Sequence, residues 1–185
     1  MSILNRNLEL WLALIAVLGI TFIYLLVVVI THGVPPAGNF FGHAVGIIGF
    51  LLMLMTETLY SLRKRSRLAK WGRMSDWLGF HIFTGIVGPY MVLLHTSWKF
   101  NGLAEIVTFL TVLIVVSGFV GRYIYTAIPR TVDETELKAG QATWLANRRR
   151  YLSLWYTVHI PIGAVLFTTA FLHIIGALYY ATFLH

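Results

Sequence analysis

The chain has 185 residues, of which 58% are hydrophobic and only 11% are charged, and its mean hydropathy is +0.77. Soluble domains carry about 25% charged residues, so this composition excludes a soluble globular domain, a disordered tail and a nucleic-acid-binding module. The sequence contains no cysteine, which excludes disulfides, thiolate zinc sites, iron–sulfur clusters and covalent c-type haem attachment. The formal net charge is +7, and in a chain this apolar a basic excess is first an indicator of membrane topology.

Five apolar segments are each long enough to cross a bilayer, which takes about 20 residues. The first contains the apolar run Leu10–Ile30, which is longer than the core of a cleaved signal peptide, about 7–15 residues. We therefore expect this segment to be retained as a transmembrane helix. We predict an all-α membrane protein in which a single domain, residues 1–185, forms a five-helix transmembrane bundle. The predicted helices cover, to within a few residues, 9–31, 39–61, 76–98, 102–127 and 154–182.

The Lys and Arg residues are unevenly distributed over the predicted loops. Thirteen of the 14 lie before the first helix, between the second and third helices, or between the end of the fourth helix and the start of the fifth. Only Lys99 lies on the other side. Because short cytoplasmic loops carry an excess of Lys and Arg, we predict that the N-terminus is cytoplasmic and the C-terminus is outside. We expect an integral protein of a bacterial or archaeal cytoplasmic (inner) membrane.

Two predicted helices carry matched pairs of histidines. His81 and His95 are 14 positions apart on the third helix, and His159 and His173 are 14 positions apart on the fifth. At about 100° per residue this spacing returns each pair to one helix face, with an axial separation of about 21 Å. Both helices are odd-numbered and therefore run parallel. His81 is expected level with His159 near the cytoplasmic side, and His95 level with His173 near the outer side.

Two facing histidines at one depth are the arrangement that a bis-imidazole haem requires. Neutral imidazole is a good axial ligand for iron, and ligation removes the cost of an unpaired polar ring in lipid. We therefore predict two non-covalent b-type haems, held by His81 with His159 and by His95 with His173, about 20 Å apart across the bilayer. A single intramembrane histidine could instead be a hydrogen-bonded interior residue or part of a proton relay.

Small residues accompany these histidines in the predicted helices. Small residues of this kind indicate close helix packing, or space for a flat macrocycle between the helices, or both. The residues are Gly85 and Gly88 on the third helix, Gly118 and Gly121 on the fourth, and Gly163 on the fifth.

The histidine segments resemble the ferric reductase-like transmembrane domain. His81-Ile-Phe-Thr-Gly85, ending at His95-Thr96, is similar to the third helix of that family. Arg148-Arg149-Arg150-Tyr151, followed by Trp155, His159 and His173, is similar to its basic and aromatic entry into the second haem helix. The resemblance covers about residues 40–180 and implies the same two bis-histidine haems, with one-electron transfer across the membrane. NADPH oxidases and metalloreductases share this domain.

Several arginines adjoin the predicted haem helices. We consider Arg122, Arg148 and Arg149 as candidates for binding haem propionates or a cytoplasmic partner, with anionic lipid contact as the alternative. The sequence ends at His185, and we expect no flavin or nicotinamide domain. The chain is therefore expected to have no complete catalytic site of its own and to pass electrons within a larger redox complex, with other redox subunits or redox proteins on one or both sides. No nucleic acid is expected.

Two alternatives remain open. The double histidine spacing also resembles the haem helices of quinol-oxidising cytochrome b, and a quinol-oxidising or quinone-reducing subunit would use a proton-accepting site that includes His43 or Glu105. His43 is predicted near the outer end of the second helix, where it could also ligate a further haem. The other alternative is a haem-free ion or proton transporter that uses the histidine rows as a relay.

Overall fold

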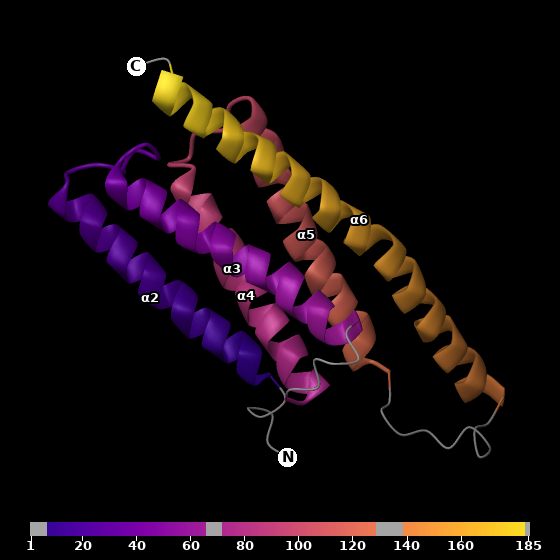
Figure 1. The fold of residues 1–185 in the computed structure, drawn as a ribbon. Coiled ribbons are helices and arrows are strands. Elements are labelled where there is room, and N and C mark those ends of the chain that lie inside the picture. Colours follow the sequence, from indigo (N-terminus) through magenta and orange to yellow (C-terminus); the bar gives the residue numbers. More distant parts are fainter. Residues whose placement is uncertain (1–6, 66–71, 129–138, 184–185) are drawn as a thin grey trace. The chain divides into compact units, whose positions relative to one another are not determined.

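The computed structural model describes residues 7–65, 72–128 and 139–183, and the regular elements in these ranges are all α-helices (Figure 1). Each of the five is long and apolar enough to cross a membrane. The predicted all-α class and the predicted number of long apolar helices are confirmed, and they indicate an integral membrane protein. The helices are α2 (Leu8–Ile30), α3 (Phe40–Arg65), α4 (Met74–His95), α5 (Leu103–Thr126) and α6 (Ala139–Phe183).

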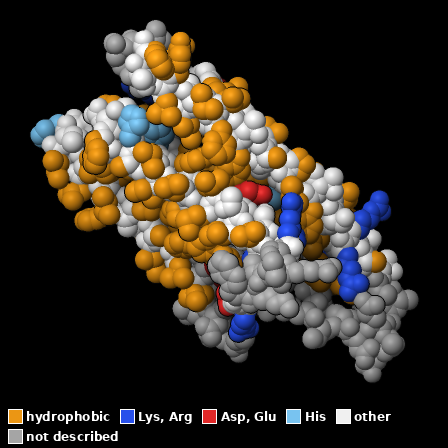
Figure 2. Space-filling model, in the orientation of Figure 1, with side chains coloured by type: hydrophobic (Ala, Val, Ile, Leu, Met, Phe, Trp, Pro, Cys, Tyr) orange, Lys and Arg blue, Asp and Glu red, His pale blue; other side chains and the backbone are white. Residues whose placement is uncertain are grey.

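Large apolar side chains cover the surface of these helices. Hydrophobic side chains are spread over the described helices on the face shown in Figure 2. In α2, for example, Phe22 and Val29 are each 69% exposed. A helix that is apolar on every side requires an apolar surrounding, because exposing this much apolar surface to water is unfavourable in free energy. The exposed faces therefore suit lipid contact.

The largest difference from the predicted boundaries is the start of the last helix. The apolar segment was expected to begin near residue 154, whereas α6 begins at Ala139 and has 45 residues. Residues 139–153 contain three Ala, three Arg and two Leu, which favour helix, and no proline. A helix of this length spans about 68 Å, more than twice the hydrocarbon thickness of about 30 Å. Part of α6 therefore extends beyond the hydrocarbon, and Arg148, Arg149 and Arg150 lie on a helix.

α4 ends slightly earlier than predicted. Its last residue is His95, Thr96 forms the C-cap, and Ser97 and Trp98 adopt positive φ angles of 50° and 60°. Two consecutive left-handed residues cannot continue a right-handed helix. The hydroxyl of Ser97 donates a hydrogen bond of 2.6 Å to the carbonyl of Pro35, which ties the end of α4 to the loop between α2 and α3.

The chain divides into two compact units, residues 1–108 and 109–185. In the first unit α4 packs against both α3 and α2. Gly49 of α3 meets Gly88 of α4 so closely that a Cβ on either glycine would lie 2.9 Å from the carbonyl oxygen of the other. Only glycine permits this approach. The packing role predicted for Gly88 is therefore confirmed.

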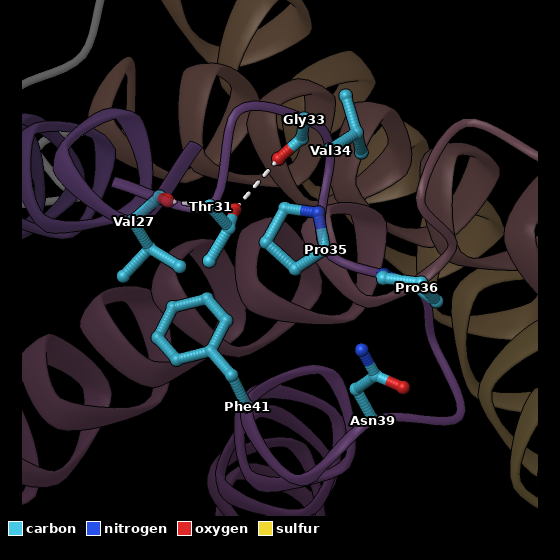
Figure 3. A pocket seen from close by; sticks show the side chains of 8 residues that line it. All are labelled: Val27, Thr31, Gly33, Val34, Pro35, Pro36, Asn39 and Phe41. Carbon is cyan, nitrogen blue, oxygen red and sulfur yellow. Dashed lines mark hydrogen bonds between the residues drawn. The ribbon is translucent and has the colours of Figure 1, made fainter. Parts of the chain in front are cut away.

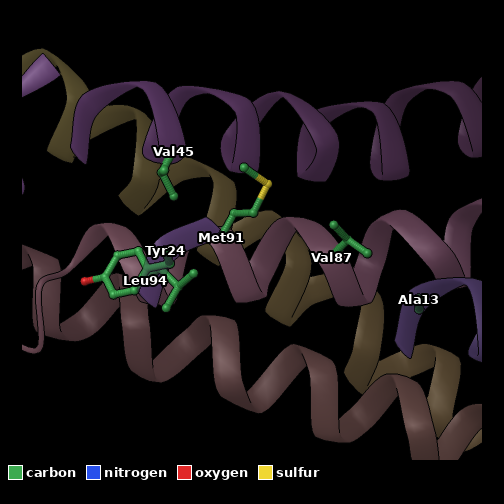
Figure 4. Close-up of a cluster of buried hydrophobic side chains, with 6 residues drawn as sticks. All are labelled: Ala13, Tyr24, Val45, Val87, Met91 and Leu94. Carbon is green, nitrogen blue, oxygen red and sulfur yellow. The ribbon is translucent and has the colours of Figure 1, made fainter. Parts of the chain in front are cut away.

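A buried apolar cluster stabilises the first unit. In Figure 4, Val45 of α3 points toward α4, where Met91 and Leu94 lie, and the ring of Tyr24 from α2 lies beside Leu94. The hydroxyl of Thr21 on α2 also forms a hydrogen bond with the hydroxyl of Tyr90 on α4. These contacts hold α4, the helix that carries His81 and His95, between its two neighbours.

Candidate functional site

His81 lies half-buried on α4, in the first unit. Its Nδ1 is 3.1 Å from the carbonyl oxygen of Thr56 on α3. A carbonyl only accepts, so in the neutral ring Nδ1 carries the proton and Nε2 keeps the lone pair. The ring of Tyr60 packs against the imidazole with 4.7 Å between centroids. The result is a shielded ring whose orientation is fixed from α3.

His95 is held in the same way at the other end of α4. Its Nδ1–H donates a hydrogen bond of 2.9 Å to the carbonyl of Gly42 on α3. The ring also lies directly against Gly46, where a Cβ would be 2.7 Å from Cγ and Nδ1 of His95. Gly46 therefore allows the imidazole to pack onto the backbone of α3, and Nε2 is again the nitrogen with the lone pair.

His159 lies on α6, in the second unit, beside the hydroxyl of Ser117 on α5. The Nδ1–Oγ distance is 3.0 Å. The indole of Trp155 stacks on the imidazole, with centroids 4.5 Å apart and 28° between planes. Trp155 is itself fixed, because its Nε1–H donates a hydrogen bond of 2.7 Å to the carbonyl of Ser117. A Cβ at Gly121 would overlap the indole ring, so this glycine provides the space for Trp155.

His173 lies further along α6, half-buried like His159. The spacing of the two residues places them about 21 Å apart along one helix. Each predicted ligand pair combines a residue of the first unit with a residue of the second. The pairing of His81 with His159 and of His95 with His173 therefore stays a prediction.

The candidate arginines of the second unit lie in different environments. The guanidinium of Arg148 lies over two aromatic rings, 5.8 Å from the centroid of Tyr123 and 5.4 Å from that of Trp144. Cation–π contacts of this kind hold the charge at the helix surface. Arg122 is half-buried and Arg149 is exposed.

His43 and Glu105, the candidate quinone or proton residues, are both exposed. The ring of His43 lies 6.2 Å from that of His95, centroid to centroid, with 60° between the planes. Its Nδ1 is 3.3 Å from the carbonyl of Asn39. Glu105 occupies the first turn of α5. The structure therefore brings His43 into contact with the candidate ligand His95.

A small pocket lies where α2 leads into α3. Its volume is about 230 Å³, and Figure 3 shows Phe41 and Pro35 facing it, with Asn39 at its edge. Ligand pockets usually measure about 300–1,000 Å³, so this space suits no more than a small ring or headgroup. Asn39 links the pocket to His43, because its carbonyl faces the imidazole Nδ1.

The residues that orient the imidazoles were not predicted from the sequence. They are Gly42 and Thr56, through their carbonyls, Gly46, through its missing side chain, and Ser117, through its hydroxyl. Ser117 was the most accessible to prediction, because a hydroxyl inside an apolar span needs a partner. Main-chain carbonyls cannot be predicted in this way, because every residue has one.

In comparisons with known proteins, no family model, no curated protein and no solved structure matches this chain. Among the described residues there is also no group of three or more His, Asp or Glu side chains that could hold a metal ion. The candidate site therefore rests on single imidazoles and on the groups that orient them.

Proposed function

We propose that this chain is a b-type dihaem membrane subunit that passes electrons across the membrane within a larger redox complex, as the resemblance to the ferric reductase-like transmembrane domain implies. The observation that carries the proposal is the common orientation of two candidate ligands. The Nδ1–H groups of His81 and His95 each donate to a main-chain carbonyl of α3, and Nδ1 of His159 lies 3.0 Å from the hydroxyl of Ser117. A hydrogen bond at Nδ1 orients a ligating imidazole and leaves Nε2 as the nitrogen that binds a metal.

The same observation disfavours a haem-free proton relay. A relay histidine takes a proton at one ring nitrogen and releases it from the other. In His81 and His95 one nitrogen is committed to a main-chain carbonyl of α3. Proton release at that nitrogen would break this hydrogen bond, which contributes about 0.5–1.5 kcal/mol. The geometry therefore suits ligation better than proton transfer.

Four histidines would bind the two haems, and neighbouring aromatic residues shield them. His81 with His159 and His95 with His173 would be the axial ligands, and the rings of Tyr60 and Trp155 shield two of these imidazoles from water. A bound haem supplies one-electron oxidation and reduction of its iron. Because His81 and His95 are about 21 Å apart along α4, two sites at these levels span most of the hydrocarbon.

The basic residues support the proposed orientation. α3 ends in Arg63, Lys64 and Arg65, and the start of α6 carries Arg148 and Arg149. Placing these ends in the cytoplasm, with the C-terminus outside, follows the positive-inside rule. On this side Arg122, Arg148 and Arg149 are available for haem propionates or for an acidic partner. The proposed location is a bacterial or archaeal cytoplasmic membrane.

Haem content tests the proposal directly. The full chain, purified in detergent, should contain about two non-covalent haems, since each pair of axial histidines holds one. Acidified organic solvent should extract all of the haem, because the sequence offers no cysteine for covalent attachment.

A second candidate function, quinol oxidation or quinone reduction, is favoured by the position of His43. Its ring lies 6.2 Å from that of His95, and the neighbouring pocket is large enough for a single-ring headgroup. An exposed imidazole there could accept the proton that a quinol releases. Glu105 is the other candidate acceptor.

The variant His43→Ala separates the two functions. We expect both haem signals to remain, because two histidine pairs already supply the axial ligands. If a quinol binds here, reduction by quinol should slow by about 10²-fold, the lower end of a general-base contribution, while reduction by dithionite stays unchanged. Stopped-flow haem reduction with both reductants measures this. Unchanged quinol kinetics would remove His43 from the reaction, and loss of a haem signal would make it an axial ligand.

A further inference from the structure

A chain of hydroxyl groups connects α3 to α4 beside His81. The side chain of Thr84 on α4 is fully buried, at 0% exposure, and Thr56 on α3 is 9% exposed. Thr56 Oγ1 donates to Thr84 Oγ1 over 2.7 Å, and Thr84 Oγ1 donates to the carbonyl of Phe80 over 2.9 Å. Hydrogen bonds in a water-free surrounding are strong and directional, so this chain fixes the separation of the two helices.

Thr56 also contacts His81 through its main chain. Thr56 offers its hydroxyl to Thr84 and its carbonyl to Nδ1 of His81, 3.1 Å away. Thr84 follows His81 by three positions and therefore lies on the same face of α4. The two bonds cross one helix–helix interface about one turn apart. A movement of α3 away from α4 at this point would lengthen both bonds together.

We infer that the Thr56–Thr84 hydroxyl pair is a positioning device for His81 that sets the reduction potential of the haem at the cytoplasmic level. The inference rests on the proposed function. A firm Nδ1–H bond to a carbonyl raises the basicity of a ligating imidazole. A more basic ligand stabilises ferric over ferrous iron and lowers the midpoint potential. The hydroxyl pair keeps the Thr56 carbonyl within hydrogen-bond reach of Nδ1, 3.1 Å away, and so keeps this potential low.

His95 provides an internal reference on the same helix. Its Nδ1–H is bonded to the carbonyl of Gly42, which lies in the first turn of α3, whereas Thr56 lies near the other end of that helix. A change at Thr84 is therefore local to His81. General loosening of the interface between α3 and α4 would affect both histidines.

The variant Thr84→Val tests the inference, because it removes the hydroxyl and keeps the shape. The Thr56 hydroxyl then retains the carbonyl of Leu52 as an acceptor, 2.8 Å away. We expect a higher midpoint potential for the haem component that His81→Ala abolishes, an unchanged potential for the other component, and about 10-fold weaker haem binding in titrations of the apo-protein. Thr84→Ser, which restores the hydroxyl, should behave as the wild type.

The variant Thr56→Val breaks the same bond from its other end while keeping the Thr56 carbonyl, so it should shift the same component in the same direction. Unchanged potentials in Thr84→Val or Thr56→Val, or equal shifts of both components, would overturn the inference. A wild-type chain that binds no haem at all would instead end the proposed function. The two failures are therefore distinguishable by haem content alone.

Discussion

Replacing His81 or His159 by alanine is expected to remove one and the same haem, and replacing His95 or His173 the other. Each variant should retain about one haem per chain, because the loss of one axial ligand empties only the site at its own level. Redox titration followed by optical and low-temperature EPR spectroscopy identifies which component is missing. The expected effect is the near-complete loss of one spectral component in each variant.

The control for this series is a histidine outside the two pairs. His32 lies just beyond the end of α2 and is exposed, so His32→Ala should keep both components. If His81→Ala and His173→Ala removed the same component, the parallel pairing of the levels would be wrong. The four candidate ligands would then have to be paired across the levels.

A single methyl group at Gly46 is expected to disable the proposed outer haem site. The Cβ of Gly46→Ala would lie 2.7 Å from Cγ and Nδ1 of His95, and no real contact of this kind is so short. The ring must move, and its bond to the Gly42 carbonyl must weaken. Loss of a hydrogen bond that orients a metal ligand weakens metal binding by about 10–100-fold, so the component that His95→Ala removes should be lost at low haem concentration.

Gly19→Ala is the matched control, because a Cβ at this position of α2 has no atom within 4 Å. Both variants place a methyl group on a long apolar helix. We expect haem titration of the two apo-proteins to show weaker haem binding in Gly46→Ala only, because only that methyl group collides with His95. Equal haem binding by Gly46→Ala and the wild type would mean that the orientation of His95 seen in the structure is not required for ligation.

The number and approximate positions of the helices could be predicted because lipid imposes a simple rule. A span needs about 20 apolar residues, and its backbone polar groups must be satisfied within the helix. The same rule failed at the start of α6, because hydropathy marks where a helix enters lipid, not where it begins. Residues 139–153 are polar enough to be outside the hydrocarbon and still favour helix.

The candidate ligands could be predicted from spacing, whereas the groups that orient them could not. The interval between His81 and His95 is visible on one helix. That His81 faces the carbonyl of Thr56 depends on how α3 and α4 are aligned. The close contact of Gly49 with Gly88 and the bond between Thr56 and Thr84 together fix that alignment. Every residue has a carbonyl, so no residue type marks the one that accepts from an imidazole.

The most direct test of the proposed function is a reduced-minus-oxidised spectrum of the purified full chain with haem quantified per polypeptide. The predicted result is a b-type spectrum with about two haems per chain and two components of different midpoint potential, because each histidine pair has its own set of hydrogen-bond partners. A haem content near zero in protein that is folded and was produced with ample haem would contradict the account, and the histidine rows would then need another function.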